Sequence, residues 1–290
     1  MKLSFAIVGC GRVGTALAKY LAEAGYIPAG LASKSISSAK RVADLIGSVN
    51  FTDIAWEATR KADIVFITTP DGTIKEACDS ISEKNGFKSG SVVLHCSGAL
   101  SSTELMSAKT CGANIGSMHP LQSFASTEYE FNPFSGIVTS VEGDREAVDA
   151  AKHVTEDLGS YCVTIKTEAK MLYHASAVVA SNYLVTLLDL SLSLIKLAGV
   201  TGEDALRGLK PLIEGTISNV EKMGIQNALT GPIARGDIQI IEKHLSEIGS
   251  KTPQLLSLYK TLGLYTVEIA KEKGSISEAV RKRLEDLFQS

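Results

Sequence analysis

A glycine-rich turn near the amino terminus is the clearest chemical feature of the sequence. Gly9-Cys10-Gly11-Arg12-Val13-Gly14 has the spacing G-x-G-x-x-G and directly follows the apolar run Leu3–Val8. In this pattern the first glycine permits a tight turn, the second lets a pyrophosphate approach the backbone, and the third lets the next helix pack close to the sheet. Free N–H groups at the start of that helix attract an anion. The pattern predicts a dinucleotide site, and a purely structural strand-to-helix turn is the simpler alternative.

The residues after the second expected strand, Ile27–Ala32, indicate which dinucleotide would bind. An NAD site usually has an Asp or Glu about 20 residues beyond the glycines, which accepts a hydrogen bond from the ribose 2′-OH. Residues 24–43 contain no acid, and Ser33, Lys34 and Ser35 follow the strand instead. Because hydroxyls and a cation suit a 2′-phosphate, the sequence predicts NADP (NADPH) as the cofactor. For Lys34 a solvated helix face is the alternative.

A further expected strand, Asp63–Thr68, leads into a proline-containing turn. Open α/β sheets bind ligands at the carboxyl ends of their strands. We therefore expect Thr68, Thr69 and Pro70 to line the cofactor site as well. Asp71 either belongs to the same edge or caps the following helix.

Two histidines follow other expected strands and could exchange a proton with a substrate. His95 ends the expected strand Val92–His95, and His119 follows Asn114–Met118. An imidazole that titrates near neutral pH suits general acid–base chemistry. We take His119 as a catalytic candidate, His95 as a substrate-binding candidate, and Ser97 as a hydroxyl for either role. A histidine bonded only to a loop carbonyl is the structural alternative.

A polar stripe crosses the apolar helix expected over Lys170–Leu197. Lys170, His174 and Ser181 share one face, since offsets of 4 and 11 residues return to nearly the same direction around a helix. Burying such groups without partners costs several kcal/mol, so the stripe faces a cleft or meets a polar network. Lys170 and His174 are therefore catalytic candidates. A helix-packing seam in which Lys170 reaches solvent is the alternative.

The turn at residues 230–237 carries one further candidate, Arg235. Its guanidinium suits bidentate capture of a substrate carboxylate. An Arg–Asp pair that braces the turn explains the same residues.

These side chains require two kinds of architecture to position them. In residues 1–166 short β-branched runs alternate with helical patterns, which is typical of βαβ units. In residues 167–290 the strand signals stop and helical periodicity takes over. We expect an α/β fold class: a doubly wound, mostly parallel Rossmann sheet over 1–166, followed by an all-helical carboxyl-terminal domain over 167–290 for substrate binding and dimerisation. The strands are expected at Leu3–Val8, Ile27–Ala32, Asp63–Thr68, Val92–His95, Asn114–Met118, Ile137–Ser140 and Cys162–Ile165.

Composition excludes several classes of protein. With 29 Lys and Arg against 32 Asp and Glu, the formal charge of −3 gives no positive field for nucleic acid or an anionic membrane surface. The most apolar stretch, Ala175–Gly199, contains Asn182, Asp189 and Lys196, so we expect a buried helix and no membrane span. Five scattered cysteines without a C-x-x-C pair predict reduced thiols, a cytoplasmic protein and no metal site. The redox sensitivity of Cys10 stays open.

The chain resembles the 6-phosphogluconate dehydrogenase-like superfamily. It is most similar to a branch with a Rossmann-like NADP-binding domain and a helical domain of unknown function, laid out like pyrroline-5-carboxylate reductase. The resemblance implies an NADP-linked oxidoreductase and a homodimer whose helical domains interlock. It also implies that a helix lysine and an asparagine act at the substrate, which here are Lys170 and Asn182. The segments that carry it are Gly9–Gly14, Thr68–Asp71, His95–Leu100, His119–Gln122, Lys170–Tyr183 and Gly231–Asp237.

Together these features lead to one principal hypothesis and two others. The first is an NADP-dependent reductase or dehydrogenase that transfers a hydride to or from a small carboxylate-bearing ketone, hydroxyacid or imine. Either direction of transfer fits. The alternative is a non-catalytic NADP-binding sensor or assembly protein. A Rossmann methyltransferase fits less well, because basic residues after the second strand suit a dinucleotide better than a methyl donor.

Overall fold

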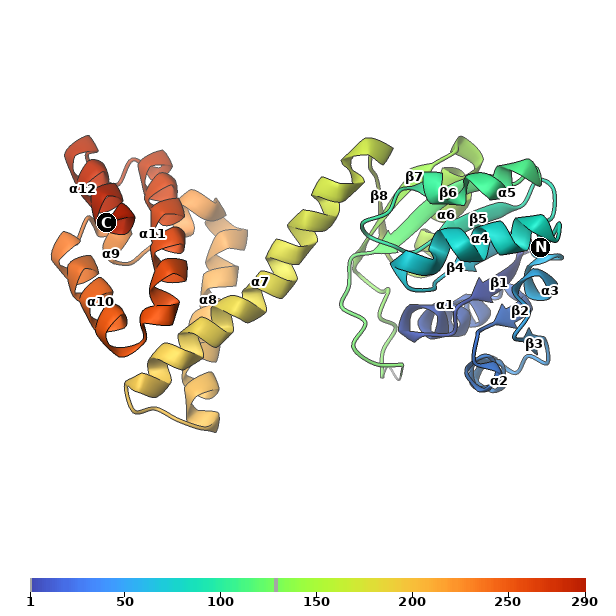
Figure 1. Cartoon of the computed structure of the whole chain (residues 1–290), viewed down its shortest axis with the longest axis horizontal. Helices are drawn as coiled ribbons and strands as arrows, with labels where there is room; N and C mark the ends of the chain where they lie inside the picture. The colour runs from blue at the N-terminus through green and yellow to red at the C-terminus, as the bar shows by residue number, and fades with distance from the viewer. Residues whose placement is uncertain (1, 128–129) are drawn as a thin grey trace. The chain divides into compact units, whose positions relative to one another are not determined.

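An eight-stranded sheet organises the first part of the chain in the computed structural model, which describes residues 2–127 and 130–290 (Figure 1). The strand order is β3-β2-β1-β4-β5-β6-β7-β8, and every neighbouring pair is parallel except β6 with β7. The sheet is doubly wound, because the chain moves outward from β1 first to one side and then to the other. The strands are β1 (Ser4–Val8), β2 (Ile27–Ala32), β3 (Phe51–Thr52), β4 (Ile64–Ile67), β5 (Val92–His95), β6 (Asn114–Pro120), β7 (Val138–Gly143) and β8 (Tyr161–Thr164).

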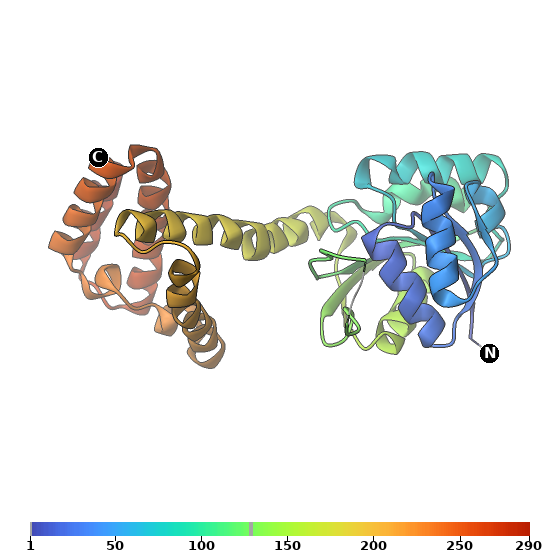
Figure 2. The same cartoon turned by 90° about the horizontal axis from the view of Figure 1, so that it is seen from below.

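Helices cover both faces of this sheet (Figure 2). Alternate residues of β1 explain why: Phe5 and Ile7 join one apolar core, while Ala6 and Val8 join the other. A strand with two buried faces reads as a continuous apolar run, as β1 does. The helices in this part of the chain are α1 (Arg12–Glu23), α2 (Ile36–Ile46), α3 (Ala55–Thr59), α4 (Ile74–Glu83), α5 (Met106–Thr110) and α6 (Arg145–Asp157). Three short 3₁₀ helices accompany them: η1 (Asp71–Thr73), η2 (Ser102–Leu105) and η3 (Thr167–Ala169).

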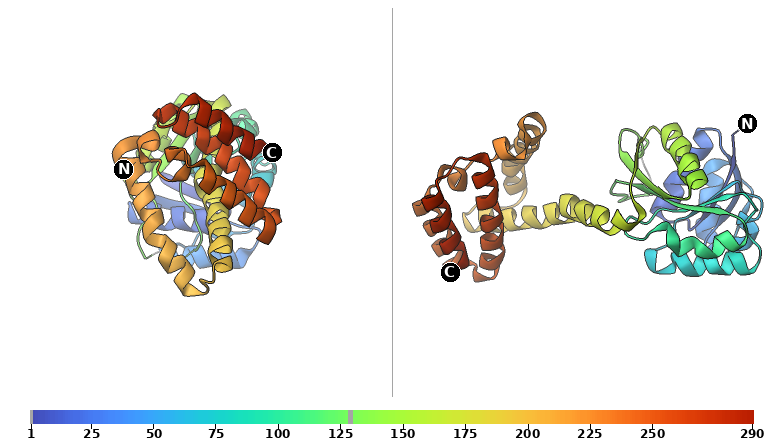
Figure 3. Two further views of the ribbon diagram at one scale, coloured as in Figure 1. Left: turned by 90° about the vertical axis from the view of Figure 1, so that its left-hand side faces the viewer. Right: turned by 90° about the horizontal axis from the view of Figure 1, so that it is seen from above.

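The rest of the chain is helical, as expected. Helices α10, α11 and α12 enclose a small core that contains Ile241, Val267, Leu284 and Phe288 (Figure 3). Gly263 allows α11 to pack closely against Phe288 of α12, because a Cβ at this position would lie 2.3 Å from the Phe288 ring. The helices are α7 (Lys170–Leu197), α8 (Glu203–Ala228), α9 (Pro232–Arg235), α10 (Ile238–Lys251), α11 (Pro253–Lys273) and α12 (Glu278–Gln289).

The chain divides into two compact units, Met1–Ser181 and Asn182–Ser290. The division falls within α7, whereas the change of pattern at residues 166 and 167 marks the end of the strands. The first turns of α7, including Lys170 and His174, therefore belong with the sheet.

The exposure of α7 corrects one expectation. The segment Thr167–Leu197 has a mean hydropathy of 1.7, and only 6% of its most apolar window is buried, so it is not the buried helix that its composition indicated. By length and composition alone it could cross a membrane. Apolar residues lie all around α7, so no single stripe defines one buried face. Its exposed apolar side chains include Leu172, Val179, Tyr183 and Val185.

The glycine turn gives a test of the fold. A Cβ on Gly14 would lie 2.0 Å from the carbonyl oxygen of Gly9 and 2.6 Å from Oγ1 of Thr68, whereas a Cβ on Gly11 would meet nothing within 4 Å. We predict that Gly14→Ala destabilises the first unit by about 2 kcal/mol or more through overpacking. The matched variant Gly11→Ala should cost about 1 kcal/mol or less. Urea unfolding followed by circular dichroism measures both, and equal stabilities would contradict the prediction.

Candidate functional site

A cavity of about 600 Å³ lies over the glycine turn, at the carboxyl ends of β1, β2 and β4. Most of the predicted cofactor residues line it. Gly14 lies beneath the turn instead, where it contacts Gly9 and Thr68, and the Ser35 hydroxyl is paired with that of Ser37 at 2.8 Å. The lining residues are Gly9, Cys10, Gly11, Arg12, Val13, Ser33, Lys34, Ser38, Thr68, Thr69, Pro70, Thr73 and Phe124.

The backbone of the turn is fixed by its neighbours. Gly9 has a φ of +108°, and a Cβ there would lie 2.8 Å from the backbone of Thr68 and Thr69, so only glycine fits. The Thr68 hydroxyl donates to the Gly9 carbonyl at 2.6 Å. Gly11 stands at the N-cap of α1 and offers no side-chain oxygen to the first N–H groups of the helix. These N–H groups are therefore available to an anion.

Cys10 of this turn is a buried thiol. Its Sγ lies 3.6 Å from the carbonyl oxygen of Ala32. Burial raises the pKa of Cys10 to about 11, against the opposing charge of Arg41. Because the thiolate is the reactive form, Cys10 is protonated at neutral pH and is not primed for oxidation.

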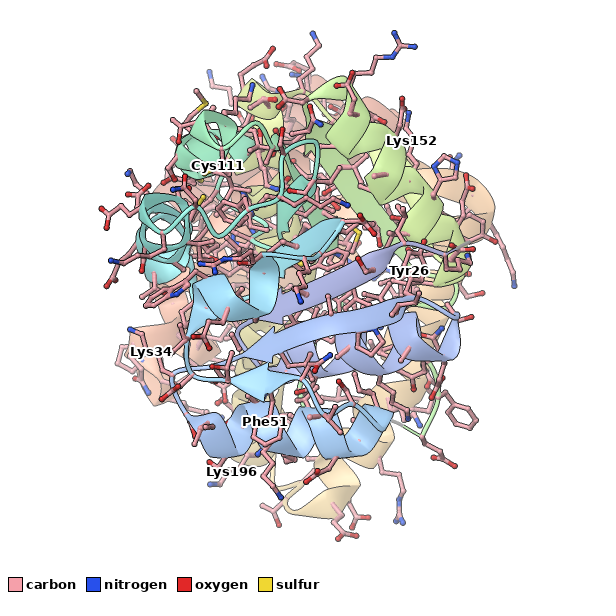
Figure 4. The ribbon with its side chains drawn as sticks, turned by 90° about the vertical axis from the view of Figure 1, so that its right-hand side faces the viewer. Tyr26, Lys34, Phe51, Cys111, Lys152 and Lys196 are labelled. Carbon is pink, nitrogen blue, oxygen red and sulfur yellow. The ribbon has the colours of Figure 1, made fainter. Side chains whose placement is uncertain are left out.

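A second hollow adjoins the first and shares Gly9, Ser33, Lys34, Thr69 and Thr73 with it. Lys34 follows the end of β2, and Phe51 opens β3, as Figure 4 shows. Sequence reasoning missed the residues that the β3–α3 segment contributes here, because a two-residue strand leaves no periodic pattern. They are Asp53, Ala55 and Trp56, and Trp56 is the only tryptophan in the sequence.

A buried ion pair between Lys170 and Glu142 lies beside strands β6 and β7. The Lys170 side chain is 1% exposed, its Nζ donates to the Ser117 hydroxyl, and it lies 3.8 Å from Oε1 of Glu142. Burial lowers the pKa of Lys170 to about 8, although the carboxylate of Glu142 opposes this shift. Lys170 thus meets the polar network that its position on an apolar helix required, and it does not reach solvent.

Glu142 is a site residue that the sequence reasoning missed. The strand was expected to end at Ser140, but β7 continues to Gly143 and pairs Glu142 with Ser117 across the antiparallel β6–β7 ladder. The Ser117 hydroxyl donates to Glu142 Oε1 at 2.6 Å. An acid next to a glycine at the end of an apolar strand was the available signal.

His119 and His174 lie against Gly98. A Cβ on Gly98 would be 2.7 Å from Nε2 of His119 and 2.7 Å from Nδ1 of His174. The two rings are edge to face with centroids 6.3 Å apart, and the ring of Tyr173 is 6.0 Å from that of His119. Three buried polar atoms here, Nδ1 of each histidine and the Tyr173 hydroxyl, have no hydrogen-bond partner among the described residues. Such atoms are free to bind a ligand.

The protonation state of His119 follows from its surroundings. Burial lowers the pKa of His119 to about 4, and the nearby charge of Lys170 acts in the same direction. His119 is therefore neutral at pH 7 and can hydrogen-bond a substrate without carrying charge.

His95 and Ser97 are committed to their own loop. The Ser97 N–H donates to His95 Nδ1 at 3.2 Å, so Nε2 carries the proton that the Ser101 carbonyl accepts at 3.0 Å. The Ser97 hydroxyl accepts from the N–H groups of Ala99 and Leu100 at 3.2 and 3.0 Å. These contacts correspond to the structural alternative for His95, and they shape the loop that places Gly98.

The remaining two candidates belong to the second unit. Asn182 is exposed on α7, more than three turns beyond Lys170 along the helix. The Arg235 guanidinium pairs with Asp237 at 2.9 Å on the turn around α9, which is the bracing contact considered above. The structure therefore places Lys170, His174 and His119 together in the first unit, with both histidines against Gly98, whereas Asn182 and Arg235 lie in the second unit.

Two family models match successive parts of the chain. Residues 1–120 match a model of a Rossmann-like domain, and residues 137–266 match a model of a domain of unknown function, DUF2520. This is the layout that the resemblance implied. The glycine turn lies in the first match, while Glu142 and Lys170 both lie in the second. No curated protein matches the chain.

Solved structures share the whole fold. Protein TM1727 from Thermotoga maritima is 29% identical, with a TM-score of 0.73 over 93% of this chain and 99% of that chain. A Bacteroides fragilis protein assigned as an NADP oxidoreductase is 23% identical, with a TM-score of 0.72 over 90% and 96%. A pyrroline-5-carboxylate reductase from Coxiella burnetii is 14% identical, with a TM-score of 0.59 over 99% of both chains. The Rossmann-like sheet and its helical extension are thus an established architecture.

The buried histidines give a testable pH dependence. Burial also lowers the pKa of His95 to about 4, so neither His95 nor His119 takes up a proton in the folded state until the pH falls far below 6.5. Since the unfolded chain binds these protons near pH 6.5, the free energy of unfolding should fall between pH 6.5 and pH 4. We predict that His95→Ala reduces this slope and costs about 2–4 kcal/mol at pH 7, because Ser97 N–H and Ser101 C=O lose their partner.

Urea unfolding at several pH values measures both effects. The control is His153→Ala, at an exposed histidine on α6, which should change stability by less than about 0.5 kcal/mol. If His95→Ala were as stable as this control, the structural role of His95 would be refuted.

Proposed function

We propose that this protein is an NADP-dependent oxidoreductase that transfers a hydride to or from a small carboxylate-bearing ketone, hydroxyacid or imine. One observation carries the proposal: an anion-binding glycine turn and a buried, charged lysine lie at the same edge of one sheet. Asp71, which follows the cavity residue Pro70, is close enough to Lys170 to influence its pKa. The similarity to the fold of NADP oxidoreductases and pyrroline-5-carboxylate reductases supports the assignment.

The two adjoining hollows fit the parts of a dinucleotide. The glycine turn would hold the pyrophosphate on the free N–H groups of α1. Ser33, Lys34 and Ser35 would hold the 2′-phosphate. Trp56 and Asp53 line the second hollow, where they would offer an adenine ring an aromatic surface and a hydrogen-bond acceptor. When bound, the cofactor would supply or accept the hydride.

The protein's own residues would manage the proton. Reduction of a carbonyl or imine leaves an oxygen or nitrogen that needs a proton, and the best donor has a pKa near the working pH. Lys170, with a pKa of about 8, meets this condition, whereas His119, with a pKa of about 4, does not. We therefore assign Lys170 as the acid in reduction and as the base in oxidation, with His119 and His174 as hydrogen-bonding residues for the substrate.

The remaining residues would contribute to substrate recognition. Arg235 is a candidate for gripping the carboxylate, and Asn182 for orienting the substrate; Ser97 would act indirectly, through the loop that holds Gly98. We also propose a homodimer, because α7 leaves Leu172, Val179 and other apolar side chains exposed to a degree that a single chain rarely tolerates. A partner copy would cover them. The proposal places the protein in the cytoplasm.

Turnover tests this function. Purified protein is assayed by the loss of NADPH absorbance with a panel of 2-keto acids and cyclic imines. We predict turnover of at least one of them, with kcat/KM falling as the pH rises above about 8, because Lys170 must be protonated to donate. Lys170→Met should lower kcat/KM by about 10²-fold or more.

The control is Lys152→Met, at a half-buried lysine on α6, which should retain the wild-type rate. Equal activity of the Lys170→Met and Lys152→Met variants would remove Lys170 from the reaction. Saturable NADPH binding without turnover of any compound would favour the non-catalytic sensor.

A further inference from the structure

We infer that Glu142 is a positioning residue that holds the ammonium group of Lys170 in place and keeps it charged, with the Ser117 hydroxyl as the bridge between them. The inference rests on the proposed role of Lys170. Glu142 would act through Lys170, and we assign it no contact with a substrate.

Four hydrogen-bond donors converge on Glu142. Its carboxylate accepts from the backbone N–H of Ser102 at 2.8 Å, the Ser102 hydroxyl at 2.8 Å, the Ser117 hydroxyl at 2.6 Å and the Thr167 hydroxyl at 2.9 Å. All four are neutral donors, and each favours the ionised carboxylate. Although burial alone would raise the pKa of Glu142, these hydrogen bonds and the charge of Lys170 lower it overall. Glu142 is therefore an anion although it is only 2% exposed.

These donors come from three different elements of the fold. Ser117 is on β6, Ser102 opens η2, and Thr167 opens η3, just before α7 begins at Lys170. A buried acid with only one partner could be an incidental ion pair. An acid that accepts from three elements fixes the start of α7 against the sheet, and this fixes the direction in which the Lys170 side chain leaves the helix.

Other titratable groups also surround Lys170. Asp71 on η1, Cys96 after β5, His95 on β5 and His119 on β6 all interact electrostatically with it. His174 lies one turn further along α7 itself. Cys96, whose pKa burial raises to about 12, is neutral, as are His95 and His119. Among the described residues, Glu142 is the only carboxylate within 4.0 Å of Nζ.

Removal of the Glu142 carboxylate would change the protonation of Lys170. Without the carboxylate, the more distant Asp71 would be the only anion opposing the effect of burial on Lys170, and the lysine would lose its proton at a lower pH. Ser117 contributes in the same direction, because it accepts a hydrogen bond from the charged ammonium group. The acid form of the residue would then be scarce at neutral pH, although Lys170 itself is unchanged.

The test is an NMR titration of the ¹⁵Nζ signal of Lys170 in the full-length protein without substrate, assigned by its absence in Lys170→Met. The wild-type midpoint is expected at about pH 8. Glu142→Gln, which keeps the shape and removes the charge, should lower the midpoint by about 1–3 pH units. The matched control Glu146→Gln, at an exposed acid on α6, should leave it unchanged.

Ser117→Ala gives an independent measurement, and it decides the question if Glu142→Gln does not fold. It keeps the carboxylate and removes the hydrogen bond, so the midpoint should fall by a smaller amount. A midpoint equal to that of wild type in the folded variants would overturn the inference.

Kinetics separates this inference from the proposed function. The pH at which kcat/KM of reduction is lost should move down in Glu142→Gln by the same amount as the NMR midpoint, while activity is regained at low pH. A uniform loss of rate at every pH would show a merely structural role and would overturn the inference. If no compound is turned over, the proposed function fails, whereas the titration still decides whether Glu142 holds the charge on Lys170.

Discussion

The ammonium group of Lys170 is removed from water, and this can be tolerated only if an anion and hydrogen-bond acceptors replace the lost hydration. The chain supplies them from an unusual place, the antiparallel end of an otherwise parallel sheet. Because β7 runs against β6, Glu142 lies directly opposite Ser117 in register, and both reach the same buried ammonium group. The rest of the site depends on this arrangement. It sets where α7 starts, and with it the place of Tyr173 beside His119 and of His174 beside Gly98.

The cofactor cradle depends on the parallel half of the same sheet. The carboxyl ends of parallel strands lie at one edge of the sheet. The strand topology alone therefore brings the turn after β1 next to the ends of β2 and β4. Gly9 and Gly14 both pack closely against Thr68, at the end of β4, and neither position has room for a side chain. The turn is therefore held tightly against the end of β4. The two halves of the sheet thus provide different chemistry. Backbone N–H groups after β1, in the parallel part, suit an anion, and the buried cation beside β6 and β7 suits proton transfer.

The sequence predicted the parts that local patterns determine. The strands Ile27–Ala32 and Val92–His95 and the helix Lys170–Leu197 have the predicted bounds, since apolar runs and their glycine, proline or polar boundaries are local features. The features that the sequence did not predict depend on contacts between distant parts of the chain. Strand β3 has only two residues, the position of Glu142 depends on the register of β6 with β7, and the exposure of α7 cannot be seen in its composition. The polar stripe predicted a partner for Lys170, but not which one.

The central claim is that the glycine turn and the residues after β2 form an NADP site. Trp56, the only tryptophan, lines the adjoining hollow, so its fluorescence reports directly on occupancy. Titration with NADP⁺ and NAD⁺ should give saturable quenching, with tighter binding of NADP⁺. Lys34→Ala should weaken NADP⁺ binding by about tenfold and leave NAD⁺ unaffected, since only the 2′-phosphate uses that charge. Absence of saturable quenching by either nucleotide, or the same loss for both in Lys34→Ala, would contradict this account.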